Sequence, residues 1–266
     1  MRRRSLKCGG EAVPGDFSDT GGLPHGAFRY PRGKPAGRVV VHHALLQPRS
    51  AGTIVEAEAT VEQSGPQAHF HILAQLTKLR RAACDPRLVS PNLDIVGAKV
   101  RTFADLASEL SANGHKALVF SQFVDFLTLL REPRDAAGIL YQYLDGSTPV
   151  ADRERRIRDF QAGKGDLFLI NLKAGGFGLN LTAADYVIIT DPWWNPAAED
   201  QAMGRAHRMG QLRPVTVYRL VAQGTLEEQI IALHHDKRAL ADGVLADSGE
   251  AMSLPSQDDL LSLMRG

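Results

Sequence analysis

From about residue 69 onward, hydrophobic and polar positions follow regular periods. Residues 69–89 have the spacing of an amphipathic helix, with Ile72, Leu76 and Leu79 on one stripe. Five short apolar runs typical of buried strands follow it: ALVFSQF, YQYLDGS, DLFLIN, YVIIT and PVTVYRLVA. Amphipathic segments separate these runs, and one of them is expected to stop at Pro133. This alternation predicts an α/β fold, a single lobe whose parallel sheet carries helices on both faces.

The first 65 residues lack such a pattern. Gly and Pro recur there, and the only clear strand is RVVVH at residues 38–42. Such a stretch buries little apolar surface against its ordering entropy. We therefore predict three regions: a poorly structured segment at 1–65, disordered or non-homologous, the structured lobe at 66–245, and a C-terminal tail at 246–266.

Composition narrows the class of protein. With 266 residues, 44% of them hydrophobic, the chain can bury the core of one large domain. The formal net charge is +1, so only a local basic patch could attract nucleic acid. Cys8 and Cys84 are far apart, which argues against a disulfide framework or a zinc site. No apolar run reaches transmembrane length and no signal peptide is evident, so we expect a cytoplasmic protein without membrane contact.

Three polar residues near the C-terminal end share one face of a predicted helix. In DQAMGRAHRMGQ, Gln201, Arg205 and Arg208 stand at i, i+4 and i+7. One amide and two guanidiniums on one face can bind a highly charged anion, because the planar fork of Arg fits phosphate oxygens. A solvated basic helix face is the alternative explanation of this spacing.

A glycine-rich loop, KAGGFG, follows the predicted strand DLFLIN. Glycines accept positive φ angles and let backbone amides approach a phosphate closely. By itself, such a loop favours a tight turn from strand to helix.

The blocks KAGGFGLNLTAAD and GRAHRMGQ, with DPWWNP between them, resemble motifs V and VI of the Swi/Snf-type ATPases, the double-stranded-DNA translocases of helicase superfamily 2. The resemblance covers about residues 71–240. It implies a RecA-like lobe, the C-terminal helicase lobe of a chromatin-remodelling-type ATPase, with ATP bound between it and an N-terminal RecA-like lobe. It implies that Arg205 and Arg208 stabilise the charge of the transition state and that Gln201 positions the γ-phosphate or the attacking water. It also makes Gly175, Gly176 and Gly178 of the KAGGFG loop candidate interdomain and phosphate-contact positions.

The same resemblance implies contacts with double-stranded DNA. Ser121 and Gln122 fall on motif IV, Lys173 lies in motif V as a backbone contact, and Trp194 and Asn195 match the WNP of the family. The structural alternatives are a helix cap for Ser121 and a core position for Trp194.

A further DNA contact is expected before the arginine-rich helix. Ser147 and Thr148 precede it, and hydroxyls and amides at a helix N-terminus can hold a phosphate. Helix capping alone would explain both residues equally well. Arg153, Arg155 and Arg156 on that helix are either DNA contacts or a solvated face.

Two elements of a complete ATPase are missing from the sequence. It contains no GxxxxGK[ST] loop and no acidic DExH-like pair, which grip the phosphates and the magnesium in P-loop ATPases. In the family both lie on the first lobe, so we expect the second lobe only, with Mg²⁺ held by the absent lobe and no ATP turnover by this chain alone. The alternatives are a non-catalytic regulatory module that binds DNA or a partner, and an inactive fragment of a split or frameshifted gene.

Overall fold

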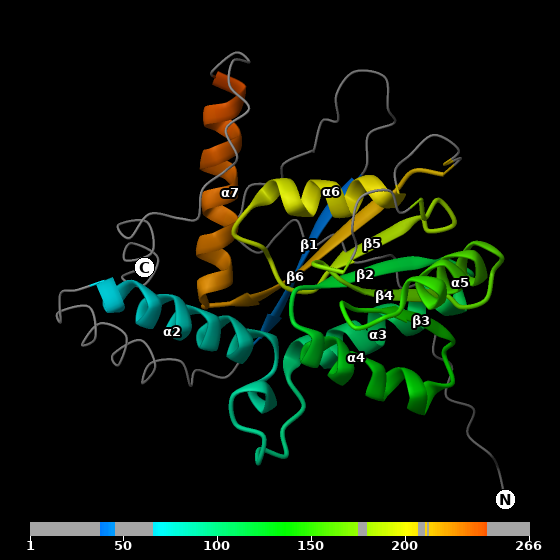
Figure 1. The fold of residues 1–266 in the computed structure, drawn as a ribbon, viewed down its shortest axis with the longest axis horizontal. Helices are drawn as coiled ribbons and strands as arrows, with labels where there is room; N and C mark the ends of the chain where they lie inside the picture. Colours follow the sequence, from blue (N-terminus) through cyan, green and yellow to red (C-terminus); the bar gives the residue numbers. More distant parts are fainter. Residues whose placement is uncertain (1–37, 46–65, 175–179, 207–210, 212, 244–266) are drawn as a thin grey trace, which may run out of the picture.

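The computed structural model describes residues 38–45, 66–174, 180–206, 211 and 213–243. These residues form a sheet in the order β1-β6-β5-β2-β4-β3, with every neighbouring pair parallel (Figure 1). The six strands are β1 (Arg38–Leu45), β2 (Ala117–Ser121), β3 (Tyr141–Leu144), β4 (Leu167–Asn171), β5 (Tyr186–Ile189) and β6 (Thr216–Gln223). The predicted parallel α/β lobe is therefore confirmed, and all five predicted strands are present.

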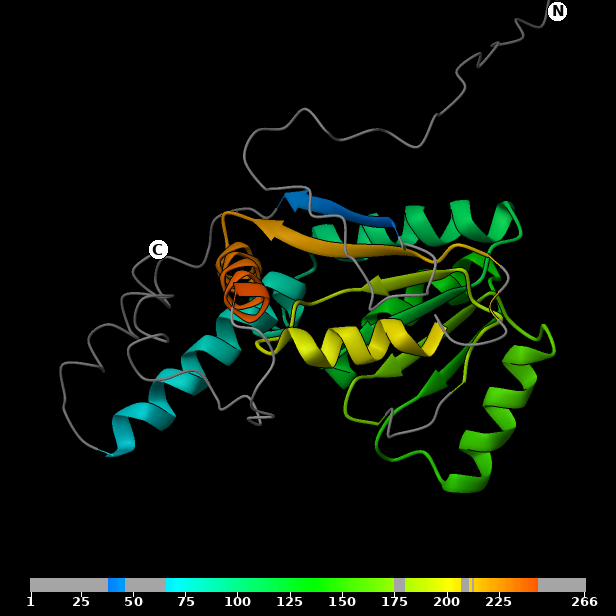
Figure 2. The ribbon, with the colours of Figure 1, turned by 90° about the horizontal axis from the view of Figure 1, so that it is seen from above.

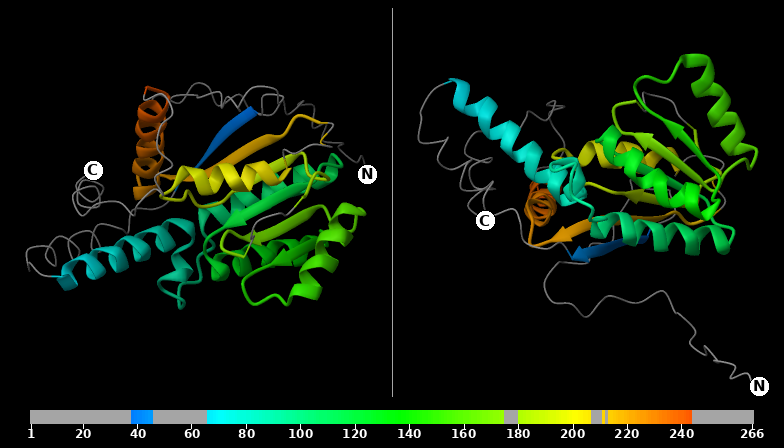
Figure 3. Two further views of the ribbon diagram at one scale, coloured as in Figure 1. Left: turned by 45° about the horizontal axis from the view of Figure 1, so that its top comes forward. Right: turned by 90° about the horizontal axis from the view of Figure 1, so that it is seen from below.

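Helices cover both faces of this sheet, as Figure 3 shows from two sides. They are α2 (Pro66–Cys84), the short 3₁₀ helix η1 (Pro86–Leu88), α3 (Ala98–Ala112), α4 (Val124–Ala137), α5 (Val150–Gln161), α6 (Pro196–Ala206) and α7 (Leu226–Gly243). Alternate residues of β2 belong to different clusters: Leu118 packs with α5 and α6, whereas Val119 packs with α3 and α4. Every residue of β2 and β4 is buried, as expected for central strands covered on both faces.

The helices α2 and α7 pack against each other beyond the carboxyl end of the sheet (Figure 2). Ile72 and Leu76 of the predicted amphipathic stripe are buried against Leu226 and Ile230 of α7. Trp194, half-buried, joins this third cluster. The helix that precedes the sheet is thus fixed to the helix that follows it.

The strand expected in the N-terminal segment is confirmed, and it extends further than predicted. β1 pairs with β6 in parallel from Arg38 opposite Thr216 to Leu45 opposite Gln223. Residues 38–45 therefore add a sixth strand to the edge of the lobe. The other residues of the 1–65 segment and the whole 246–266 tail lie outside the described residues, so the domain boundaries stay a prediction.

The predicted stop at Pro133 is wrong, because α4 continues through this residue to Ala137 and ends at Gly138, whose φ is +67°. A proline inside a helix removes one backbone hydrogen bond and crowds the preceding turn. The next residue provides the compensating contacts. Arg134 is buried, its guanidinium carbon lies 5.2 Å from the ring centroid of Phe103, and its Nη1 donates to the Ala104 carbonyl at 3.2 Å. Tertiary packing thus outweighs the local preference.

Candidate functional site

Polar side chains gather where three neighbouring parallel strands end. Ser121 ends β2, Asn171 ends β4 opposite it, and Thr190 and Asp191 come directly after β5. All four residues are buried. Because parallel strands end at the same edge, the sheet brings together side chains that are far apart in the sequence. Ligands of parallel α/β sheets bind at this carboxyl edge.

The loops after β2, β4 and β5 meet at this edge, and we call this meeting point the junction. Asn171 joins the loop after β2 to the loop after β4. Its Nδ2 donates to the carbonyls of Ser121 at 3.2 Å and Gln122 at 2.9 Å, and its Oδ1 accepts from the Lys173 amide at 3.2 Å. Lys173 itself is exposed. Sequence reasoning did not single out Asn171, although a polar residue at the end of the otherwise apolar strand LFLIN was a usable signal.

Ser121 and Gln122, both expected to contact DNA, belong to this junction. The hydroxyl of Ser121 is buried and accepts from the amide of Phe123 at 3.0 Å. The backbone amide of Gln122 donates to Oδ2 of Asp191 at 3.2 Å, while its half-buried side chain has no partner for Nε2 among the described residues. Ser121 therefore positions the loop, and the contacts of both residues with DNA stay a prediction.

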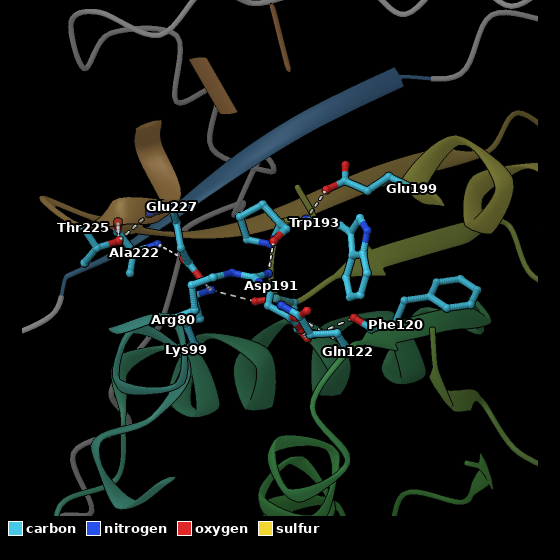
Figure 4. Close-up of polar contacts among 12 residues, drawn as sticks. Arg80, Lys99, Phe120, Gln122, Asp191, Trp193, Glu199, Ala222, Thr225 and Glu227 are labelled. Carbon is cyan, nitrogen blue, oxygen red and sulfur yellow. Dashed lines mark hydrogen bonds and ion pairs between the residues drawn. The ribbon is translucent and has the colours of Figure 1, made fainter. Parts of the chain in front are cut away.

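Asp191 is the buried carboxylate at the centre of the junction (Figure 4). It accepts hydrogen bonds from the amide of Gln122 and, at 3.0 Å, from the hydroxyl of Thr190. Burial raises the pKa of Asp191 to about 6, and the nearby charges of Arg80 and Lys99 limit the rise. The sequence analysis did not identify this residue, which follows the strand YVIIT.

Two ion pairs are buried near the carboxyl edge of the sheet. Nζ of Lys99 lies 2.6 Å from a Glu227 carboxylate oxygen and donates to the Thr190 carbonyl at 2.7 Å. Nε of Arg219 lies 2.8 Å from Glu199, at the side of α6 that faces the sheet. Burial alone would raise the pKa of Glu199, but Arg219 and His234 outweigh it, and the pKa stays below its ordinary value. These pairs fix α3, α6 and α7 to the edge of the sheet.

The helix predicted to carry the anion-binding face is present as α6. Its two described candidate residues, Gln201 and Arg205, differ in their exposure to solvent. Gln201 is exposed, whereas Arg205, one turn later, is 3% exposed, with its guanidinium carbon 5.3 Å from the ring centroid of Phe120. Arg208 lies outside the described residues. The alternative explanation, a solvated basic face, therefore does not describe Arg205, which packs over the end of β2.

The DPWWNP loop leads into α6 and fixes its start. Oδ1 of Asn195 accepts from the amide of Ala197 at 2.9 Å, which is the hydrogen bond of a helix cap. The amide of Trp193 donates to Glu199 at 3.0 Å. Trp194 is half-buried in the cluster of α2 and α7. Asn195 and Trp194 thus have structural contacts, and their contact with DNA stays a prediction.

The turn after β3 contains the other two residues expected to hold a phosphate. Ser147 donates from its hydroxyl to Oδ1 of Asp145 at 2.7 Å and from its amide at 2.9 Å, and the Thr148 hydroxyl contacts the same oxygen at 3.1 Å. The helix cap of α5 is Pro149, so neither residue caps it directly. Burial alone would raise the pKa of Asp145, but hydrogen bonds from Ser147, Tyr143 and Thr148 outweigh it and lower that pKa.

The arginines of α5 divide into two kinds. Nη1 of Arg153 donates to the Ala174 carbonyl in the loop after β4 at 2.8 Å, and Arg156 donates to the Tyr143 carbonyl of β3, so both fix α5 to the sheet and its loops. Arg155 is exposed and pairs with Asp152 at 2.8 Å, as expected for a solvated face. The predicted phosphate contacts Gly175, Gly176 and Gly178 lie outside the described residues.

Residues 98–210 match the family model described as the helicase conserved C-terminal domain. This stretch contains all strands of the junction and α6, whereas Arg80, Arg219 and α7 lie outside it. Together with the parallel sheet and its polar carboxyl edge, the match defines the class of the chain as a helicase C-terminal domain. Among the described helices, none has the length and apolarity needed to span a membrane.

Similarity to individual proteins narrows this class. The chromatin-remodeling ATPase INO80 of Cryptococcus neoformans is 39% identical over 180 residues, which are 64% of this chain and 10% of that protein. The C-terminal domain of the Sulfolobus solfataricus SWI2/SNF2 ATPase has a TM-score of 0.62 and 28% identity, covering 79% of this chain and 90% of that chain. The core of the same ATPase, solved with double-stranded DNA, has a TM-score of 0.64 and 30% identity over 78% of this chain and 45% of that chain.

The chain therefore contains a helicase conserved C-terminal domain, and it is similar to the corresponding part of the SNF2/Swi2-type chromatin-remodelling ATPases. This confirms the resemblance identified from the sequence motifs. The chain spans from 9% to 24% of the length of the curated relatives that it matches.

Proposed function

We propose that the chain is the second lobe of an ATP-dependent double-stranded-DNA translocase. ATP would bind between this lobe and an N-terminal RecA-like lobe, and opening and closing of the cleft would step the protein along duplex DNA. In this proposal Gln201 positions the γ-phosphate or the attacking water, and Arg205 and Arg208 stabilise the charge that develops on the phosphoryl oxygens.

The observation that carries this proposal is the convergence of four sequence segments on the carboxyl edge of the sheet. The loops after β2, β4 and β5 are joined there by Asn171 and Asp191, and α6 packs over the same edge through Arg205. All four segments carry residues assigned to DNA or ATP by the family motifs. A lobe built in this way can couple ATP hydrolysis at α6 to DNA contacts on the loops beside it.

One exposed side chain on α6 suits a phosphate ligand. Gln201 offers its amide at the surface, and the charge of Arg205, buried over Phe120 one turn further along the helix, supports the same assignment. Within the described ranges, no group of three or more His, Cys, Asp or Glu is placed to hold a metal ion. ATP brings the phosphoryl group that is transferred, and in our proposal Mg²⁺ is held by the first lobe.

The proposed DNA-facing groups lie on the loops beside α6. Lys173 is exposed directly after β4 and brings a positive charge that can neutralise one phosphate. Trp194 and Asn195 lie on the loop that leads into α6, and Gln122 follows β2. Ser147 and Thr148, on the turn after β3, would extend this surface.

The proposal is tested by restoring the first lobe. The chain alone should show no DNA-stimulated ATP hydrolysis, because it has no GxxxxGK[ST] loop. Fused behind the N-terminal lobe of the Sulfolobus solfataricus SWI2/SNF2 ATPase core, it should hydrolyse ATP faster when duplex DNA is added. The same fusion with Arg205→Ala is the matched control. ATP turnover by the chain alone, or a fusion whose turnover ignores duplex DNA, would contradict the proposal.

A further inference from the structure

Arg80 is a buried cation that lies on α2, before the residues that match the helicase C-terminal domain. It is only 3% exposed, yet it contacts two loops of the carboxyl edge at once. We infer that Arg80 is a positioning residue, which holds the loop after β2 and the DPWWNP loop in register and so sets the orientation of the Trp194 ring. This inference rests on the proposed function, because that proposal places Trp194 against DNA.

The guanidinium of Arg80 lies between two aromatic rings. Its carbon is 5.1 Å from the ring centroid of Trp194 and 5.6 Å from that of Phe123. Its Nη2 also donates to the Pro192 carbonyl at 2.5 Å. Phe123 directly follows Gln122, and Pro192 and Trp194 belong to the DPWWNP loop, so one side chain contacts two of the loops that the proposed function assigns to DNA.

The contacts require a planar cation. A guanidinium can stack on aromatic faces while donating in its own plane, whereas the compact ammonium of a lysine cannot do both. Burial lowers the pKa of Arg80, and the carboxylate of Asp191 counteracts this shift, so the charge is retained. Asp191 in turn accepts from the amide of Gln122. Arg80 and Asp191 therefore hold the same loop from two sides.

The position of Arg80 links α2 to this surface. Earlier in the same helix, Ile72 and Leu76 pack against Leu226 and Ile230 of α7, in the cluster that also contains Trp194. A displacement of α2 would therefore carry the Trp194 ring with it. Arg80 provides a route by which sequence on the N-terminal side of the domain can change the DNA-facing loops.

The test uses the whole chain and Trp194 as its reporter. The sequence has two tryptophans, so Trp193→Phe leaves Trp194 as the only one. In that background, Arg80→Met should shift the emission of Trp194 to longer wavelength and about double its quenching by acrylamide. Its Kd for a short DNA duplex should rise up to about tenfold, because the Trp194 ring is no longer held in place by its cation–π contact before binding, and the DNA must then order the ring. The slope of log K against log salt should stay unchanged, since Arg80 is buried and reaches no phosphate.

Arg134→Met is the matched control, because Arg134 is a buried arginine over a single ring, that of Phe103, away from both loops. This variant should lower thermal stability while leaving Trp194 quenching and DNA affinity as they were. Arg80→Lys, which keeps the charge, should behave like Arg80→Met. It replaces Arg80→Met in the same measurements if that variant does not fold.

Three results would overturn the inference. They are unchanged Trp194 quenching in both Arg80 variants, wild-type behaviour of Arg80→Lys, and equal effects of Arg80→Met and Arg134→Met. If the unmodified chain fails to bind duplex DNA at any salt concentration, the proposed function fails, whereas the quenching measurement still decides whether Arg80 positions the ring.

Discussion

Two loops predicted to hold DNA are built in opposite ways. The turn after β3 satisfies Ser147 and Thr148 through Asp145, within three positions of the chain. The loop after β2 is held by Asn171 and Asp191, across 49 to 69 positions. One loop is a local surface turn, and the other is a buried junction of three strands. Polar residues at the same edge of a sheet can therefore have their hydrogen-bond partners either within the same turn or in distant parts of the chain.

The difference has consequences for coupling. A turn that satisfies its own polar groups can change without effect on its neighbours, whereas a buried polar network loses several contacts when one member is removed. The junction after β2 also lies beneath Arg205 of α6 and beside Arg80 of α2. We expect changes at the junction to alter both ATP turnover and DNA binding, and changes at the turn to alter at most DNA binding.

The largest effect is expected where α6 meets the junction. In the fusion with a first lobe, Arg205→Ala should reduce ATP turnover by roughly 10³-fold or more, as the loss of other arginine fingers does. The KM for ATP should change much less, because the charge that the arginine stabilises develops in the transition state. Steady-state kinetics with duplex DNA measures both constants. Arg213→Ala is the control, since Arg213 is exposed and pairs with Asp185 before β5. Near-normal turnover of Arg205→Ala would remove the catalytic role of α6.

A direct comparison of the two loops comes from one substitution in each. Asn171→Ala should destabilise the chain by about 2–3 kcal/mol, because the Gln122 carbonyl loses its donor and the Lys173 amide loses its acceptor, whereas the Ser121 carbonyl keeps the amide of Leu172. Ser147→Ala should cost at most about 0.5 kcal/mol, because the residue is exposed and its amide still binds Asp145. Urea unfolding followed by circular dichroism gives both values. Equal costs would show that the two loops do not differ in the way described above.

The pH dependence of stability should reveal the buried carboxylate of the junction. The pKa of Asp191 is about 6 in the folded chain, above its ordinary value of 3.8, so the folded state binds this proton more tightly. The contribution of Asp191 to stability is therefore present at low pH and is lost as the pH rises from about 4 to about 6, by about 2–3 kcal/mol.

Asp191→Asn removes that titration. The free energy of unfolding of the variant minus that of the wild type should therefore increase over this pH window and be constant above it. Taking the difference cancels the other carboxylates, including Glu199, whose pKa is shifted the opposite way. The charged groups that face Asp191 are Arg80 of α2, Lys99 of α3 and Glu227 of α7, and they stay in both proteins. A difference that does not vary between pH 4 and pH 7 would contradict the raised pKa.

The fold could be predicted from the sequence because its signal is local. Apolar runs such as ALVFS and LFLIN fill central strands, and the RVVVH run at 38–42 lies in β1. The end of α4 could not be predicted, since the contacts of Arg134 with Phe103 and Ala104 are long-range.

For the candidate site, the sequence predicted the helix α6 but not the buried contacts around it. The structure confirms that Gln201 and Arg205 lie on one helix, whereas their role at ATP stays a prediction, and the packing of Arg205 over Phe120 was not indicated by the sequence. Asn171, Asp191 and Arg80 were missed because each acts on a partner far away in the chain. A polar residue at the end of an all-apolar strand is the signal that would have identified the first two.

The smallest expected effect concerns the exposed part of the junction. Lys173 is exposed, and its backbone amide is held by Asn171, so its side chain can be removed without disturbing the loop. Lys173→Ala should reduce the slope of log K against log salt for duplex-DNA binding by about one unit, because one phosphate contact is lost. Thermal stability should not change. Lys164→Ala is the matched control, since Lys164 is an exposed lysine that pairs with Asp159 at the end of α5. If both substitutions reduce the slope equally, the chain attracts DNA by its general charge and not through the loop after β4.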